Sequence, residues 1–230
     1  MTRTTNARIA GFTFLFYIAV GITSMVLFGR ATSGEGIAAK LASMAQHETQ
    51  VRVVVSLTIL TSLSALVLGV TLYAITRDQD SDLAMLGLTC RVVEGVNGAT
   101  SISRTLGVLS LATATGANVP DTAAAHALAA FLLRGTPTVS AIFFAVGSTL
   151  FSWLLLRGRM IPVPLAWLGV VASALLLVGL PLELFGSIRS FRGLVGWLMW
   201  LPMLVFEVWF ALRLLFKGVS APATRLSTSH

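Results

Sequence analysis

Charged residues and cysteines are scarce in this chain of 230 residues. Asp, Glu, Lys and Arg together fill only 11% of the positions, and Cys90 is the single cysteine. A soluble domain carries roughly a quarter charged residues, because water must solvate its folded surface. The low charge therefore excludes an ordinary water-soluble domain, and the lone cysteine excludes an intrachain disulfide.

Short motifs for metals, nucleotides and nucleic acids are also missing. His47 and His126 stand alone in their segments, with no H-x-x-x-H, C-x-x-C or G-x-x-x-x-G-K pattern. Lys and Arg total 16 against 9 acids, but most of them stand singly at the ends of apolar runs. They form no basic stripe with interleaved aromatic residues, which is the usual mark of a nucleic-acid surface. We therefore expect no metal, no cofactor and no nucleic-acid partner.

Apolar residues are abundant instead, at 56% of the chain with a mean hydropathy of +0.87. About 20 apolar residues, each rising 1.5 Å along a helix, cross a hydrocarbon layer roughly 30 Å thick. Runs of this length predict an all-α, polytopic membrane protein with a single domain over residues 1–218 and a short polar tail over 219–230. The six expected transmembrane helices cover 9–28, 53–75, 83–111, 138–156, 163–186 and 194–216.

Two longer connections have the pattern of short helices that lie at the membrane interface. In the segment 36–50, Ile37, Leu41 and Met44 share one helical face, as in a helix that lies on a surface. Later in the chain, Asp121 is placed to cap a helix over 123–134. Six spans put both termini on one side, and a small excess of Lys and Arg there favours a multi-pass protein of the cell membrane with cytoplasmic termini.

The expected spans contain ionisable residues, which are costly in a bilayer by about 2.5 to 3.5 kcal/mol and usually face other protein. At 100° per residue, one sector of the third span contains its polar residues, which include Ser101. Matching depths along the helices predict that Arg91 pairs with Glu94 and Glu207, and that Arg104 pairs with Glu183. The predicted ligand-binding residues are Arg91, Glu94, Asn97, Glu207, Arg104 and Glu183. The alternative is that these groups only hold helices together.

Several segments, taken in order, carry a resemblance to a family. They are ARIAGFTFLFYIAVGI, LYAIT, LAMLGLTCRVVEGV, WLLLRGRMIPVPLAWLGVV and LPMLVFEVWFALRLLFKGV. Together they resemble the bacterial integral-membrane proteins of the domain of unknown function family 4386, over nearly the whole chain. The resemblance implies a six-helix membrane fold and no established activity. Arg91, Glu94, Pro162 and Glu207 fit its recurrent polar and proline positions, whereas Arg213 departs from it.

Three functional hypotheses follow from these patterns. The first is an integral membrane protein that holds a small ligand or a proton at its polar intramembrane cluster. The second is an intramembrane enzyme in which Glu94 or Glu207 acts as an acid on a lipid-like or isoprenoid substrate. The third is a structural or regulatory membrane subunit. Membrane lipids are expected partners in all three, while a small hydrophobic or amphipathic ligand and a homo-oligomer are left open.

Overall fold

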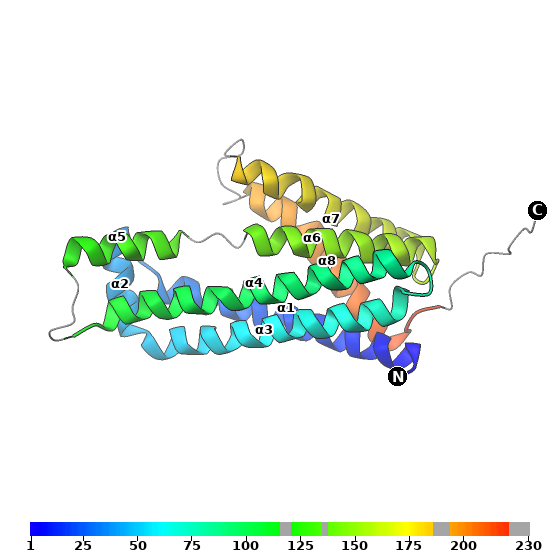
Figure 1. The fold of residues 1–230 in the computed structure, drawn as a ribbon, viewed down its shortest axis with the longest axis horizontal. Coiled ribbons are helices and arrows are strands. Elements are labelled where there is room, and N and C mark those ends of the chain that lie inside the picture. Colours follow the sequence, from blue (N-terminus) through cyan, green and yellow to red (C-terminus); the bar gives the residue numbers. More distant parts are fainter. Residues whose placement is uncertain (116–120, 135–137, 186–193, 221–230) are drawn as a thin grey trace, which may run out of the picture. The chain divides into compact units, whose positions relative to one another are not determined.

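The computed structural model describes residues 1–115, 121–134, 138–185 and 194–220, in which helices joined by turns and short loops make up the chain. The described residues contain eight α-helices and no strand (Figure 1). The helices are α1 (Arg3–Ala31), α2 (Gly36–Gln46), α3 (Glu48–Thr76), α4 (Ser81–Thr113), α5 (Thr122–Leu133), α6 (Thr138–Arg157), α7 (Val163–Leu184) and α8 (Leu194–Phe216). The predicted all-α class is thereby confirmed.

Five of these helices are long and apolar enough to cross a membrane. The qualifying stretches are Arg3–Ala31, Glu48–Thr76, Val139–Arg157, Val163–Glu183 and Leu198–Phe216. α4 is not among them, although it is the longest helix at 33 residues, because it is less apolar and carries Asp82, Arg91, Glu94 and Arg104. The chain is therefore a multi-pass membrane protein with five candidate spans.

The helices extend beyond the apolar runs that predict them. α1 begins at Arg3, six residues before the expected start at Ile9, and α3 begins at Glu48, before the expected start at Val53. The polar residues that continue these helices include Arg, Glu and Gln, which have good helix propensity. Pro162 directly precedes α7 as its N-cap, where its missing N–H costs little.

The chain divides into two compact units. Unit 1 contains Met1–Phe16, Ser64–Glu94 and Thr138–His230, and unit 2 contains Tyr17–Leu63 and Gly95–Pro137. Three helices, α1, α3 and α4, therefore contribute residues to both units. The expected single domain over 1–218 stays a prediction, and 221–230, in the predicted tail, lie outside the described residues.

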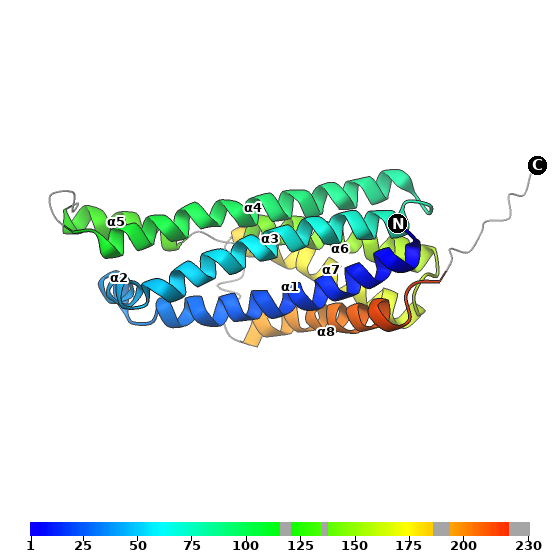
Figure 2. The ribbon, with the colours of Figure 1, turned by 90° about the horizontal axis from the view of Figure 1, so that it is seen from below.

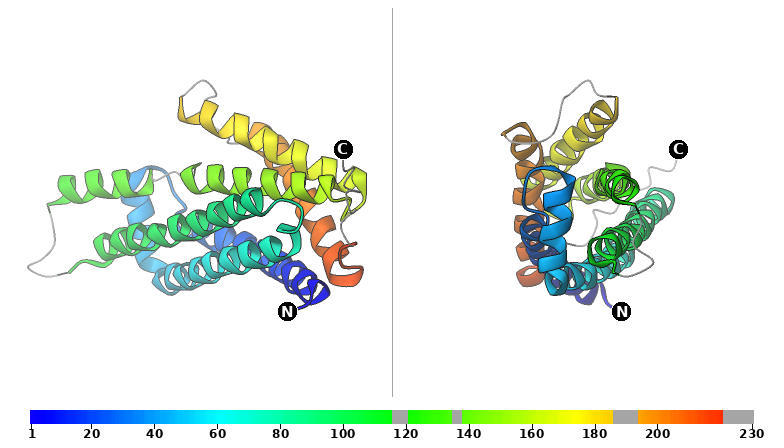
Figure 3. Two further views of the ribbon diagram at one scale, coloured as in Figure 1. Left: turned by 45° about the vertical axis from the view of Figure 1, so that its right-hand side comes forward. Right: turned by 90° about the vertical axis from the view of Figure 1, so that its left-hand side faces the viewer.

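Unit 1 is built from long helices that pack along one another. α6 packs against α7, and α7 packs against α8; Figure 1 labels the three helices, and Figure 3 shows them from two further sides. The N-terminal half of α1 contacts α8 through the rings of Phe14 and Phe210, whose centroids lie 5.6 Å apart in an edge-to-face arrangement. Figure 2 shows the course of these two helices. This packing forms the apolar surroundings of the candidate site.

Unit 2 contains both short helices that the sequence predicts. α2 packs against α5. The apolar core of this unit consists of Ala31, Leu41, Met44, Val51, Val108, Leu109 and Ala129. Asp121 caps α5 as expected, since its Oδ2 accepts hydrogen bonds from the amides of Ala123 at 3.1 Å and Ala124 at 3.3 Å. The apolar face of α2 is therefore covered by protein, while the interfacial position of both helices stays a prediction.

Candidate functional site

The polar stripe of α4 divides between the two units. Arg91 and Glu94 lie in unit 1 and are only 1% and 4% exposed. Asn97 is half-buried and Arg104 is exposed, and both lie in unit 2. Only Arg91 and Glu94 are therefore buried to the degree that the sequence predicts for a polar cluster inside the protein.

Arg91 and Glu94 form a buried ion pair. Nη1 of Arg91 donates a hydrogen bond to Oε2 of Glu94 at 2.9 Å, and the residues are three positions apart on α4. This pairing is predicted from the sequence, because residues three apart on a helix lie on the same face. The charge-assisted bond offsets part of the cost of removing both groups from water.

A second hydrogen bond ties Arg91 to α6. Its Nη2 donates to Oγ of Ser148 at 3.0 Å. Oγ of Ser140, also on α6, donates to the backbone carbonyl of Glu94 at 3.0 Å. Two serines of α6 therefore hold both ends of the Arg91–Glu94 segment of α4.

Aromatic rings surround the guanidinium group. The Cζ atom of Arg91 lies 4.7 Å from the ring centroid of Phe144 on α6 and 5.9 Å from that of Phe14 on α1. A desolvated guanidinium over an aromatic face gains a cation–π attraction of about 2 kcal/mol or more. The rings also exclude water from the ion pair, since Phe14 and Phe144 are themselves buried.

Two glycines make room for Arg91 among its neighbouring helices. A Cβ atom at Gly69 of α3 would lie 2.9 Å from Cβ of Arg91, and one at Gly147 of α6 would lie 3.2 Å from Cβ of Cys90. Such separations are shorter than ordinary van der Waals contact, so side chains at these positions would push the helices apart. Small residues are the usual means by which membrane helices approach closely.

Glu207 of α8 lies within the electrostatic field of this pair. Its side chain is 5% exposed, and both Arg91 and Glu94 interact with its carboxyl group electrostatically. Oε1 of Glu207 is buried and accepts no hydrogen bond from any described residue. The sequence predicts that Arg91 pairs with Glu207 as well as with Glu94. The Arg91–Glu94 ion pair is present, and pairing of Arg91 with Glu207 stays a prediction.

We call Arg91, Glu94 and Glu207, together with Ser148 and Phe144, the buried cluster. Ser148 and Phe144 were missed by sequence reasoning, which considered ionisable residues alone. The available signal was the four-residue spacing of Ser140, Phe144, Ser148 and Ser152, which places all four on one face of α6. Of these, Ser148 and Ser152 are almost fully buried.

The remaining predicted site residue, Glu183, lies near the end of α7, in the turn after Pro181, and is half-buried. It belongs to unit 1, whereas its predicted partner Arg104 belongs to unit 2. The Arg104–Glu183 pair therefore stays a prediction. No group of three or more His, Cys, Asp or Glu residues is placed to hold a metal ion in the described ranges.

Apolar helices that bury an arginine, two carboxyl groups and two serines define a multi-pass membrane protein with a polar interior. Residues 9–218 match the family described as "Domain of unknown function (DUF4386)". Because the match covers most of the chain, the protein belongs to this family, as its sequence segments predict. No curated protein and no solved structure matches the chain.

Proposed function

We propose that this protein is a six-span protein of the cell membrane that holds a small ligand or a proton at the buried cluster. The observation that carries the proposal is the carboxyl group of Glu207. It is buried in α8, and its Oε1 accepts no hydrogen bond from the described residues. A buried polar atom of this kind costs about 1 to 3 kcal/mol unless something binds to it.

Charge balance indicates which occupant suits Glu207. Arg91 and Glu94 neutralise each other through their ion pair. An ionised Glu207 would then give the cluster a net negative charge in a low-dielectric region, where isolated charges are strongly disfavoured. A proton on the carboxyl group restores neutrality. The cationic group of a small ligand beside it would restore neutrality and also donate a hydrogen bond to the unpaired oxygen.

α4 is the sixth span of this proposal. Its 33 residues extend for about 50 Å at 1.5 Å per residue, which exceeds a hydrocarbon layer of roughly 30 Å. Its charged residues Arg91 and Glu94 are buried in protein, while Val92 and Val96 are exposed as lipid-facing residues would be. A helix can carry such charges across a membrane when they face the protein interior.

The predicted orientation places one end of unit 1, where basic residues gather, on the cytoplasmic side. The Arg3–Asp78 and Arg157–Asp80 ion pairs join the start of α1 and the end of α6 to the α3–α4 turn. The amide of Ser220, just after α8, donates a hydrogen bond to the carbonyl of Met160 in the α6–α7 turn, so these segments gather at one end. This end carries Arg3, Arg77, Arg157, Arg159 and Lys217 against Asp78, Asp80 and Asp82. An excess of Lys and Arg in short loops favours the cytoplasmic side.

The proposal is tested with native mass spectrometry of the purified full chain and of Glu207→Gln, which keeps the size of the side chain and removes its ability to ionise. A small cationic compound that copurifies with the wild type and is lost from the variant supports a ligand site. Proton exchange at Glu207 in the infrared spectrum supports a proton site. If neither is observed and Glu207→Gln changes only stability, the proposed function is wrong, and a structural or regulatory subunit is the better description.

The enzyme hypothesis has a separate test. It requires Glu94 or Glu207 to protonate a bound substrate. Glu94 forms an ion pair with Arg91, and an ionised carboxylate has no proton to donate to a substrate. Lipidomic comparison of membranes with wild-type protein and with Glu207→Gln would reveal a substrate that accumulates in the variant, and an unchanged lipid profile would argue against catalysis.

A further inference from the structure

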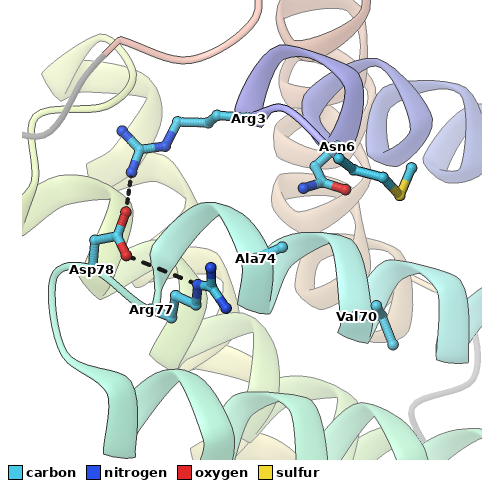
Figure 4. Close-up of a pocket in the computed structure, with 7 residues that line it drawn as sticks. Arg3, Asn6, Val70, Ala74, Arg77 and Asp78 are labelled. Atoms are coloured by element: carbon cyan, nitrogen blue, oxygen red, sulfur yellow. Dashed lines mark hydrogen bonds and ion pairs between the residues drawn. The ribbon is translucent and has the colours of Figure 1, made fainter.

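A pocket outside the buried cluster lies beside the start of α1 and the end of α3. It has a volume of about 440 Å³ and is lined by Met1, Arg3, Asn6, Val70, Ala74, Arg77 and Asp78. All of these residues belong to unit 1. Figure 4 shows Asp78 between the two arginines, with Ala74 and Val70 further along α3. We call this hollow the α1–α3 pocket.

The charged wall of the pocket is positive overall. Asp78 is shared by two cations, since it pairs with Arg3 and its Oδ1 lies 3.9 Å from Nε of Arg77. One carboxylate therefore faces two guanidinium groups. The side chain of Arg77 is 58% exposed, so most of its donors are available to an anion that enters from outside.

The other wall is apolar and continues along the surface of α3. Val67, Val70, Ala74 and Arg77 are spaced three, four and three residues apart, which places them on one helical face. Val67 and Val70 are 41% and 57% exposed. This face therefore leads from an apolar strip on a candidate membrane span directly to an arginine at the end of that span.

We propose that the α1–α3 pocket binds an anionic phospholipid, with the phosphate of its headgroup beside the guanidinium groups of Arg3 and Arg77 and an acyl chain along Val67 and Val70. An anionic phospholipid joins a phosphate to apolar chains, and this pocket joins a cationic wall to an apolar strip in the same order. Basic pockets at the ends of membrane helices are suited to such headgroups. A bidentate guanidinium–phosphate contact would add specificity to the charge attraction.

The test is native mass spectrometry of the detergent-solubilised full chain, titrated separately with phosphatidylglycerol and phosphatidylcholine of identical acyl chains. The wild type is expected to bind phosphatidylglycerol more tightly, and Arg77→Gln is expected to weaken that binding about fivefold, the usual effect of one basic residue near a membrane surface. Arg3→Gln should act in the same direction, and binding of phosphatidylcholine should be unchanged in both variants.

Arg52→Gln is the matched control, because Arg52 is also an exposed arginine on α3, at 64% exposure, but lies near the opposite end of the helix. It should leave the preference for phosphatidylglycerol intact. Inorganic phosphate and glycerol phosphate are added as competitors to separate a lipid from a free anion. The proposal is overturned if either competitor displaces the lipid at equal concentration, if Arg52→Gln weakens binding as much as Arg77→Gln, or if the wild type does not distinguish the two lipids.

Discussion

Arg91 donates a hydrogen bond of 2.9 Å to Glu94 while both side chains are almost completely shielded from solvent. The pair therefore brings two opposite charges into the protein interior on a single helix. Removing one partner leaves the other charge without compensation, which is more damaging than removing both. This relationship makes the pair the natural starting point for experiments on the stability of the protein.

Arg91→Met and Glu94→Gln are each expected to lower the free energy of unfolding by about 3 kcal/mol. The double variant should lose clearly less than the sum of the two, because no isolated charge is left. Thermal unfolding in detergent, arranged as a double-mutant cycle, measures the coupling. Arg52→Met is the control, since the Arg52–Glu48 pair is exposed and should contribute no more than about 0.5 kcal/mol. Additive effects at Arg91 and Glu94 would contradict a stabilising pair.

Phe144→Leu is expected to destabilise the protein by about 2 kcal/mol, because it removes the ring that lies 4.7 Å from the guanidinium of Arg91. Part of that loss depends on the charge of Arg91. The same substitution in an Arg91→Met background should therefore cost less. Phe12→Leu serves as the control at a ring that is 63% exposed and takes part in no cation–π contact among the described residues. An equal cost of Phe144→Leu in both backgrounds would mean that the ring acts through packing alone.

Replacing glycine by alanine is expected to change the stability of the protein in opposite directions at two positions. Gly69→Ala would place a methyl group 2.9 Å from Cβ of Arg91 and is expected to destabilise by about 1 to 3 kcal/mol. Gly21→Ala on α1 meets nothing within 4 Å and should stabilise its helix by about 0.5 to 1 kcal/mol. Thermal unfolding of the two variants compares them directly, and stabilisation by Gly69→Ala would show that α3 and α4 are not closely packed there.

The sequence predicted the helices well, because apolar runs of membrane length are long and leave few alternatives. Each of the six expected spans overlaps one helix. The third, expected over 83–111, falls within α4 (Ser81–Thr113), and the fifth, expected over 163–186, corresponds to α7, which ends at Leu184. The two short helices were also expected, and Asp121 caps the second of them. What the apolar pattern could not predict is where each helix begins, since Arg3 and Glu48 continue helices into polar sequence.

The candidate site was only partly predictable. The Arg91–Glu94 pair follows from the spacing of the two residues within one helix, and that spacing can be read from the sequence. The contacts of Arg91 with Ser148 and Phe144 depend on how α6 is rotated about its axis, and neither depth nor periodicity of a single helix determines that rotation. Glu207 is buried and interacts electrostatically with both residues of the pair, while its predicted pairing with Arg91 stays a prediction.

The most direct test of the proposed function is the infrared spectrum of the purified protein in lipid, recorded for wild type and Glu207→Gln at neutral pH. If Glu207 holds an exchangeable proton, the wild type has a C=O stretching band of a protonated carboxylic acid that shifts in deuterated water and is absent from Glu207→Gln. Asp82→Asn, at an exposed acid near the start of α4, should leave this band unchanged. If the wild type lacks the band, and no cationic compound copurifies with it, Glu207 holds neither a proton nor a ligand and the central proposal is wrong.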